Sequence, residues 1–467
     1  MLITKRGYQI NKSILSDKQI NNIKDELLLI PKLIPPFNIQ EEPINLLHQT
    51  SSNIFIPRYY GVNKFGNTNM SFNSKSINIK FNGSLNEVQQ SLIDKVMNHI
   101  KTKYGGVITL PCGYGKTVIA LYIAAQLKLK TVILVHKETL KDQWIERIKQ
   151  FLSDVSIGQV QGNTTQYDKD IIVGMIQTIS SHNYTNEFND IGLLIVDECH
   201  HIASKVFSKC LYKIGAKYTI GLSATPERKD GLTKIIHWYL GDQIIKINDK
   251  KCSQTVVYQI MYDCDNELFK VINKRFRGNT TIDTVKMTTN ICNITTRNEM
   301  IKNIIIKLLE NNKRNIMVLS GRIDHLNNLQ QMVKSSISDD INISMYIGKC
   351  NKEERLEAEN NARCIFASYS IASEGLDIPR LNTVILASPM KDVKQSVGRI
   401  MRKIHDNDAN PLIIDIVDQI PPFINYSKTK LSLYNKSNYK IKDINVMNNI
   451  NDYKIFNQSC ISELLTN

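Results

Sequence analysis

A glycine-rich turn around Gly115 has the residue types that bind phosphate groups. The apolar run VITL is followed by PCGYGKT and then by the helical pattern VIALYIAAQL. Backbone N–H groups of such a turn, at the start of a helix, can hold a triphosphate. We expect Gly113 and Gly115 to supply the turn, Lys116 to reach the β- and γ-phosphates, and Thr117 to ligate Mg²⁺. Leu110 stands where the usual pattern has glycine, so a chance loop is the alternative.

An acidic pair ends another apolar run. GLLIVD finishes at Asp197 and is followed by Glu198. A buried strand that ends in carboxylates brings them to the edge of a sheet, where ligands of α/β folds bind. We expect Asp197 to hold Mg²⁺ through water, and Glu198 to orient and deprotonate an attacking water. His200 and His201 raise the alternative of a zinc site, but no partner at ligand spacing supports it.

Two arginines late in the chain are spaced for one helix face. The sequence QSVGRIMR contains Gln395, Arg399 and Arg402. Residues three apart share a face if the segment is helical. Guanidinium groups of this kind can stabilise the charge that develops on a transferred phosphoryl group. Taken alone, a pair of surface arginines is the simpler interpretation.

The elements that would position these residues alternate in two series. The runs VITL, TVILVH, IIVGM, GLLIVD and YTIGLSAT are followed, after Asn315, by IMVLS, CIFAS, TVILAS and PLIIDIV. Continuous apolar runs separated by amphipathic helical patterns are typical of buried parallel strands. The sequence therefore predicts an α/β chain with two doubly wound parallel sheets.

The composition of the remaining segments sets the expected domain boundaries. Five prolines interrupt residues 1–80, which predicts a small accessory domain there. The tail is rich in Lys, Asn and Tyr and is interpreted as a flexible end or a basic nucleic-acid contact. The expected divisions are 1–80 accessory, 81–240 first sheet domain, 241–296 connection, 297–420 second sheet domain and 421–467 basic aromatic tail.

Charge and cysteine content limit the partners and the compartment. The 467 residues have a formal net charge of +15, which favours a polyanionic partner such as nucleic acid, although solubility is the simpler explanation. The nine cysteines include no C-x-x-C pair, which argues against a disulfide framework or a zinc ribbon. No stretch approaches the length of an apolar membrane span. We expect a protein of a reducing, intracellular compartment or of a virus particle.

The order of LPCGYGKT, DECH, SAT and Q-x-x-G-R-x-x-R resembles that of superfamily 2 helicases, over about residues 84–418. The resemblance implies two RecA-like domains that hydrolyse ATP, with Mg²⁺, in the cleft between them. It also implies roles for further residues. Those expected to bind the nucleotide are Gln89, His200, Gly375 and Asp377, and those expected to contact nucleic acid are Gln143, Trp144, Gln177, Thr178 and Ser368. Asn86 replaces the arginine that usually accompanies the adenine-recognising glutamine.

Finer details are similar to the DNA-directed branch of the superfamily. PCGYGKT, DECHH, SATPERKDG with Arg228, and QSVGRIMR resemble the excision-repair and transcription-initiation helicase of eukaryotes, and still more the poxvirus transcript-release DNA helicase and its giant-virus relatives. The resemblance implies movement along DNA in viral transcription, replication or repair, with RNA polymerase as a possible partner, in the cytoplasmic virus factory or the virion. The alternatives are a duplex translocase that separates no strands, an RNA helicase and a catalytically silent nucleic-acid scaffold.

Overall fold

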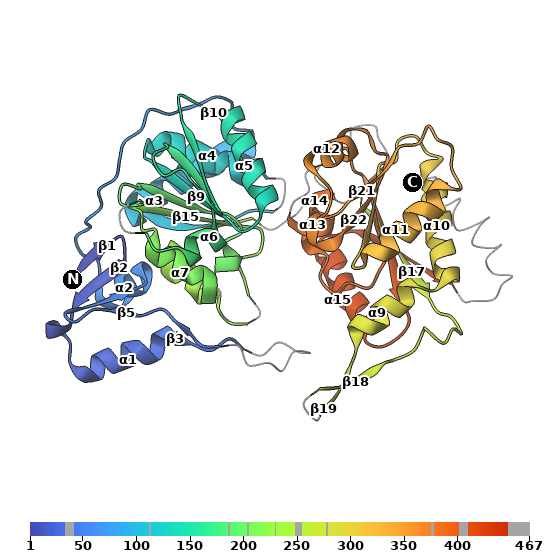
Figure 1. Cartoon of the computed structure of the whole chain (residues 1–467), viewed down its shortest axis with the longest axis horizontal. Helices are drawn as coiled ribbons and strands as arrows, with labels where there is room; N and C mark the ends of the chain where they lie inside the picture. Colours follow the sequence, from blue (N-terminus) through green and yellow to red (C-terminus); the bar gives the residue numbers. More distant parts are fainter. Residues whose placement is uncertain are drawn as a thin grey trace. The chain divides into compact units, whose positions relative to one another are not determined.

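The chain divides into two compact units, Met1–Asn248 and Asp249–Asn467 (Figure 1). The computed structural model describes residues 1–32, 42–111, 114–184, 187–202, 205–228, 230–247, 255–276, 279–374, 378–400 and 410–446. Each unit is built on its own parallel sheet. None of the helices in the described part of the chain has the length and apolar character that crossing a bilayer requires.

The first unit contains an eight-stranded sheet in the order β12-β11-β13-β9-β14-β15-β8-β16, parallel except for the edge strand β12. Its strands are β8 (Gly105–Thr109), β9 (Thr131–Val135), β11 (Ile157–Gln161), β12 (Thr164–Thr165), β13 (Ile171–Met175), β14 (Leu193–Val196), β15 (Tyr218–Ser223) and β16 (Gln243–Lys246). Its helices are α3 (Glu87–Lys103), α4 (Lys116–Leu127), α5 (Glu138–Phe151), α6 (Ile176–Ser181), the 3₁₀ turn η2 (Cys199–Ile202), α7 (Lys205–Lys213) and α8 (Thr233–Leu240).

This sheet is buried on both faces, as the continuous apolar runs predict. Val132 and Ile133 are neighbours in β9, and they belong to two different hydrophobic cores. Successive side chains of a strand point to opposite faces, so each face has its own core of packed helices. The prediction of a doubly wound parallel sheet is confirmed here, and β14 lies at its centre between β9 and β15.

The N-terminal residues form a small layer of the first unit that packs against its large sheet domain. They comprise β1 (Leu2–Thr4), β2 (Gly7–Asn11), η1 (Lys12–Ile14), α1 (Asp17–Leu27), β3 (Leu28–Leu29), β4 (Ile44–Asn45), β5 (His48–Gln49), β6 (Asn53–Ile56) and α2 (Arg58–Phe65), and then β7 (Lys80–Phe81), which pairs with β10 (Leu152–Ser153). The buried Arg58 guanidinium donates to the Lys217 carbonyl at 2.8 Å, and the Tyr59 hydroxyl donates to the Lys103 carbonyl at 3.2 Å. The predicted accessory segment therefore shares a core with the first sheet domain.

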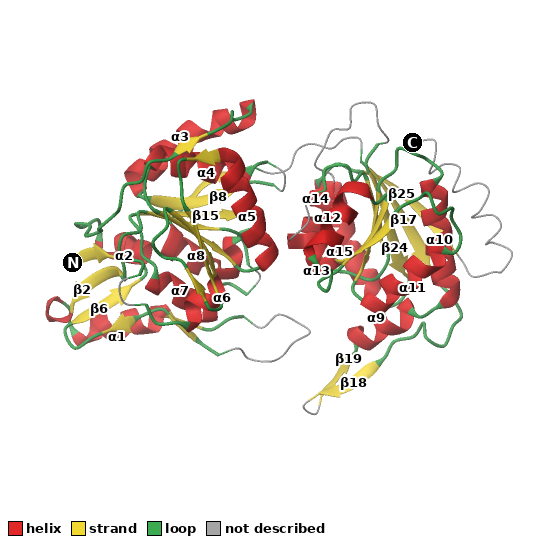
Figure 2. Cartoon of the chain, turned by 45° about the horizontal axis from the view of Figure 1, so that its top comes forward, coloured by secondary structure: helices red, strands yellow, loops and turns green. Residues whose placement is uncertain are grey.

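The second unit contains a seven-stranded, all-parallel sheet in the order β21-β22-β20-β23-β24-β17-β25 (Figure 2). The strands are β17 (Val256–Tyr262), β20 (Ile316–Ser320), β21 (Ile343–Tyr346), β22 (Cys364–Ser368), β23 (Thr383–Leu386), β24 (Leu412–Asp418) and β25 (Lys440–Val446). The helices are α9 (Thr284–Cys292), α10 (Thr295–Leu309), α11 (Ile323–Lys334), α12 (Lys352–Asn361), α13 (Tyr369–Glu374), α14 (Lys394–Ile400) and α15 (Phe423–Lys436). Strands β18 (Asn273–Phe276) and β19 (Asn279–Ile282) pair with each other and form a separate antiparallel ribbon.

The predicted connection at 241–296 is a different structure from the one expected. Strand β16 completes the first sheet by pairing with β8, and β17 lies inside the second sheet between β24 and β25. Strand β17, with the sequence VVYQIMY, is almost wholly buried. It is an apolar run like the strands that the sequence predicts. The second domain consequently begins near residue 255.

The predicted tail is also part of the second domain as far as residue 446. Helix α15 packs on β24 through Asp415, which accepts hydrogen bonds from Lys430 Nζ and, at 3.1 Å, from the Tyr434 hydroxyl. Strand β25 then pairs with β17 along its whole length. The interpretation of 421–446 as a flexible end is therefore wrong, whereas a nucleic-acid contact by this segment stays a prediction. Residues 447–467 lie outside the described residues.

Candidate functional site

The phosphate turn lies at the carboxyl end of β8 and opens helix α4. Gly115 caps the helix in a left-handed conformation, with φ 74° and ψ 38°. The positive φ favours glycine at this position, and a Cβ atom would lie 2.2 Å from Gln89 Nε2, so a larger residue would also displace the end of that side chain. The Lys116 ammonium donates to the Leu110 carbonyl at 3.1 Å. The turn, the helix N-terminus and the lysine thus meet where an anion would be bound, while Gly113 lies outside the described residues.

Gln89 is held against this turn by helix α3. Asn86 caps α3, and the two side chains form a reciprocal capping box in which Gln89 Oε1 accepts from the Asn86 N–H at 3.0 Å. Gln89 Nε2 donates to the Tyr114 carbonyl at 3.4 Å. Both ends of the amide are therefore used within the protein, one of them on the turn itself. Adenine recognition by Gln89 stays a prediction.

The acidic pair lies at the carboxyl end of the central strand β14. Asp197 Oδ2 accepts from the Trp144 indole Nε1 at 2.8 Å, and Asp197 Oδ1 accepts from the Glu198 N–H at 3.0 Å. Burial and the neighbouring Glu198 charge raise the pKa of Asp197, whereas the Trp144 hydrogen bond and Lys116 act to lower it. Glu198 has a left-handed backbone with φ 44°. Strain of this kind in a residue other than glycine is often found at functional sites.

A hydrogen-bonded chain joins the acidic pair to the next strand. His200 Nδ1 lies 3.3 Å from Glu198 Oε2 and 3.2 Å from Ser223 Oγ, at the end of β15. Arg228 donates to the His200 carbonyl at 2.6 Å and forms a bidentate pair with Asp230. Burial acts to raise the pKa of Asp230, but the hydrogen bonds from Arg228 and the Leu232 N–H, together with the Arg228 charge, hold that pKa below its usual range. The SAT turn is therefore connected to the acidic pair through His200.

The donor set at this edge fits Mg²⁺ better than zinc. Thr117 supplies a hydroxyl in the first turn of α4, and Asp197 is a buried carboxylate whose negative neighbour, Glu198, adds to the demand for a cation. Mg²⁺ is usually held by one or two oxygen ligands, water and substrate phosphates. No three His, Cys, Asp or Glu side chains gather in a metal-binding arrangement within the ranges that the structure describes.

Two of the segments expected to touch nucleic acid are bonded to each other beside this site. Gln177, exposed at the start of α6, donates to the His136 carbonyl at 2.8 Å, at the end of β9. The His136 ring packs against that of His201, with centroids 3.9 Å apart and planes tilted by 35°. The sequence did not single out His136, although its place directly after a buried strand was a usable signal. Nucleic-acid contacts by Gln177, and by the half-buried Gln143, stay predictions.

Two other residues of these segments have structural roles. Trp144 is 2% exposed, and its indole serves Asp197, so the prediction that its side chain contacts nucleic acid is wrong for this structure. Thr178 is buried at 8% exposure, and its hydroxyl accepts from the Gly162 N–H at 3.0 Å. A side chain of this kind positions a neighbouring loop and has little surface to offer a ligand.

Fewer of the expected residues in the second unit can be placed. Ser368 ends β22, and its exposed hydroxyl lies 3.1 Å from Ser370 Oγ, so its proposed contact stays a prediction. Gln395 and Arg399 lie in helix α14, and the structure describes their backbone only. Gly375, Asp377 and Arg402 lie outside the described residues, so the shared helix face of the two arginines remains a prediction.

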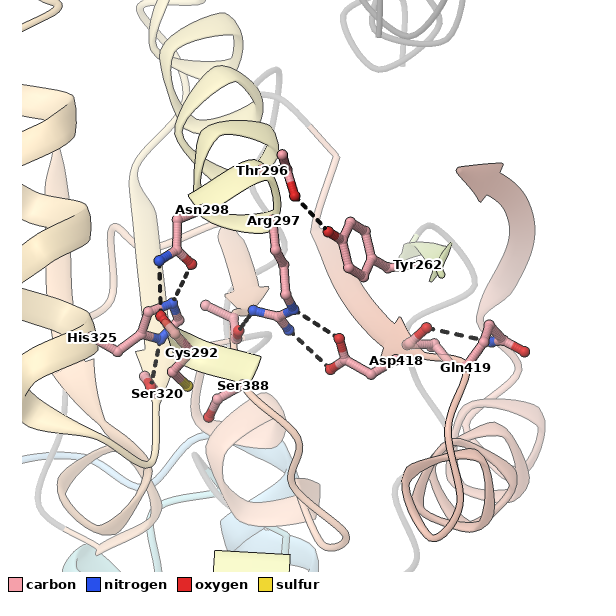
Figure 3. A network of polar contacts seen from close by, with 12 residues as sticks. Tyr262, Cys292, Thr296, Arg297, Asn298, Ser320, His325, Ser388, Asp418 and Gln419 are labelled. Carbon is pink, nitrogen blue, oxygen red and sulfur yellow. Dashed lines mark hydrogen bonds and ion pairs between the residues drawn. The ribbon is translucent and has the colours of Figure 1, made fainter. Parts of the chain in front are cut away.

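A buried polar network supports the carboxyl edge of the second sheet (Figure 3). Arg297 of α10 forms a bidentate pair with Asp418, at the end of β24, with distances of 2.7 and 3.0 Å and both side chains fully buried. Its third bond goes to the Ala387 carbonyl, just past β23, at 2.8 Å. His325 bridges Ser320 Oγ and Asn298 Oδ1, each at 3.0 Å. The ends of three strands are thus fixed by one set of contacts.

Comparisons with known families agree with this geometry. The family model described as "Type III restriction enzyme, res subunit" matches residues 82–228, and the one described as "Helicase conserved C-terminal domain" matches residues 296–404. A protein of Acanthamoeba polyphaga mimivirus named "Putative ATP-dependent RNA helicase" is 35% identical, covering 97% of this chain and 89% of its own. One of Invertebrate iridescent virus 6 named "Putative helicase" is 26% identical, covering 78% and 85%.

Solved structures show the same fold at low sequence identity. Dbp5 of S. cerevisiae bound to RNA and ADP BeF3 aligns with a TM-score of 0.54 at 13% identity, over 81% of this chain and 93% of that chain. The ATP-dependent Type ISP restriction-modification enzyme LlaBIII bound to DNA aligns with a TM-score of 0.55 at 14% identity, over 82% and 33%. Fold and site together define a RecA-like, nucleic-acid-dependent ATPase. The chain belongs to the superfamily 2 helicases.

Proposed function

We propose that this helicase moves along DNA in the replication cycle of a DNA virus, in transcript release, replication or repair. The single observation that carries its chemistry is the continuous chain from Trp144 through Asp197, Glu198 and His200 to Ser223. It fixes the acidic pair beside the phosphate turn. An RNA polymerase is the proposed protein partner, and the virus factory or the virion the proposed location.

The roles of the residues in ATP hydrolysis follow from their positions. Lys116 exchanges its bond to the Leu110 carbonyl for the β- and γ-phosphates. Thr117 and Asp197 would hold Mg²⁺, which when bound neutralises phosphate charge. Glu198 accepts the proton of the water that attacks the γ-phosphorus, while the bond to the ADP oxygen breaks.

The late residues of the proposed site act on the negative charge of the phosphoryl group during its transfer. Arg399 and Arg402, together with Gln395, would stabilise the charge of the transition state. Gly375 and Asp377 would contact the nucleotide. Gln89 contributes by holding the turn at Tyr114. Arginines in this role raise rates by roughly 10³–10⁵ in other phosphoryl-transfer enzymes.

Two observations favour DNA over RNA as the nucleic acid along which the helicase moves. His200 occupies the position where RNA helicases with a DEAD box normally have aspartate, and the family model over 82–228 is named for a restriction enzyme subunit. RNA is the second candidate, because the mimivirus relative is named as an RNA helicase.

The test compares ATP turnover with single-stranded DNA, duplex DNA and RNA as activators, alongside strand displacement. We expect DNA to stimulate turnover more than RNA, and Lys116→Ala to lower stimulated turnover by orders of magnitude. Strong DNA stimulation without displacement would identify a duplex translocase. Stimulation by RNA alone would reject the DNA assignment and favour the second candidate.

A further inference from the structure

Strands β18 and β19 form a two-stranded ribbon that stands apart from both large sheets. They pair with each other from Asn273↔Ile282 to Phe276↔Asn279, and among the described residues they pair with no other strand. The ribbon projects from the second unit beyond α9 (Figures 1 and 2). An isolated ribbon of this size has little core of its own and leaves both of its faces free of the large sheets.

The ribbon is anchored firmly at its base. The Asp283 N–H donates to the Ile272 carbonyl at 2.7 Å, which closes the two strands. The Asp283 carboxylate caps α9 by accepting from the Lys286 N–H at 3.1 Å, and it lies 3.6 Å from Lys274 Nζ. The orientation of the ribbon is therefore coupled to that of helix α9.

Helix α9 is in turn fixed to the carboxyl edge of the second sheet. Arg322, two residues after the end of β20, donates to Thr289 Oγ1 at 2.9 Å and to the Val285 carbonyl at 2.8 Å. Ligands of parallel α/β sheets bind at this edge. The ribbon thus extends from the side of the domain on which a ligand of the sheet would lie.

The charge of the ribbon selects a polyanionic partner. The ribbon sequence, residues 273–282, contains three basic residues and no acidic one, and the acidic Asp283 follows it directly. Arg275 is exposed and lies directly opposite the exposed Thr280, so the two share a face. Asn273 and Ile282 are the next pair on the same face, because side chains alternate along a strand. This face therefore offers a guanidinium, an amide, a hydroxyl and an apolar group.

We propose that the β18–β19 ribbon binds duplex DNA by entering its major groove with the face that carries Arg275. The major groove of B-DNA is wide enough for a two-stranded ribbon, and guanidinium, amide and methyl groups are the partners of its base edges and phosphates. The major groove of A-form RNA is deep and narrow and excludes such an element. The inference rests on the proposed function, which names DNA as the nucleic acid along which the helicase moves.

The test measures equilibrium binding of the full-length protein to duplex DNA, single-stranded DNA and duplex RNA, without nucleotide. Arg275→Glu should weaken duplex DNA binding about ten-fold and reduce the salt dependence by about one counterion, with little effect on the other two ligands. Lys334→Glu is the matched control. It makes the same charge change on an exposed residue at the end of α11, which runs back toward the opposite edge of the sheet.

A gain-of-function variant distinguishes a lost DNA contact from a general loss of folding. Thr280→Arg places a second cation on the proposed face and should tighten duplex DNA binding several-fold. Equal affinities of Arg275→Glu and the wild type for duplex DNA would overturn the role of the ribbon, as would an equal loss in Lys334→Glu or an equal loss on duplex RNA. A wild-type protein that binds RNA but no duplex DNA would overturn both the ribbon and the DNA assignment.

Discussion

The indole Nε1 of Trp144 lies 2.8 Å from Oδ2 of Asp197, and both side chains are buried. This hydrogen bond connects α5, whose sequence resembles a nucleic-acid-contacting segment, to the carboxylate expected to hold the cation. An outer partner of this kind fixes the orientation of a ligand, and its loss typically lowers metal affinity or activity by roughly 10- to 100-fold. We therefore expect Trp144 to position the Asp197 carboxylate.

Trp144→Phe should lower the affinity for Mg²⁺-ATP about ten-fold and reduce ATP turnover, because the phenyl ring keeps the packing but not the donor. Leaving Asp197 Oδ2 without its donor should also cost about 1–3 kcal/mol of stability. Calorimetric titration with Mg²⁺ and a non-hydrolysable ATP analogue measures the affinity directly. The matched control is Trp238→Phe, which alters a half-buried tryptophan that packs on Tyr60. Equal affinities of Trp144→Phe and the wild type would remove the positioning role.

Glu198→Gln should abolish nearly all ATP turnover and yet raise thermal stability at pH 8. The Glu198 charge is, after burial, a main cause of the raised pKa of Asp197. A carboxyl whose folded pKa is raised loses stability as pH rises through that pKa, because the native state must release a proton that it binds more tightly than the unfolded chain does. Melting temperatures of wild type and variant should therefore differ more at pH 8 than at pH 5. A difference that grows on acidification would contradict this assignment.

The sequence predicted the positions of most buried strands because each is a continuous apolar run between helical patterns. β14 and β22 are examples, and their carboxyl ends carry the expected site residues Asp197 and Ser368. The sequence did not predict β25. Its residues, KIKDINV, mix lysines with apolar residues, as is typical of an edge strand, and the segment was therefore interpreted as part of a basic tail. The sequence also could not show which way Trp144 points, because residue order does not determine whether a side chain faces a ligand or the core.

Arg297→Met should destabilise the second unit by about 3–5 kcal/mol, because it leaves the fully buried Asp418 carboxylate without its counter-charge. Adding Asp418→Leu should recover much of this loss, since both charges are then removed. Hydrogen exchange of peptides from β20 and β24 measures the local opening free energy. The control is Lys302→Met on the same helix, where a partly exposed pair with Glu299 is worth at most about 1 kcal/mol. Similar protection in Arg297→Met and the control would show that the network is not needed for stability.

The network should also make the second unit sensitive to acid. Burial, together with the positive charge of Arg297, lowers the pKa of His325 to about 3. The unfolded chain binds a proton at this residue below about pH 6.5, whereas the native state does not, so stability is complete at neutral pH and is lost as pH falls toward 3. Each pH unit in this window should cost about 1.4 kcal/mol. Hydrogen exchange of β20 peptides between pH 5 and 7 measures how steeply stability changes with pH. His325→Asn should flatten this dependence. The control His182→Asn, at an exposed site in the first unit, should leave it unchanged. If the wild type and His325→Asn had the same slope, another group would be responsible for the acid sensitivity.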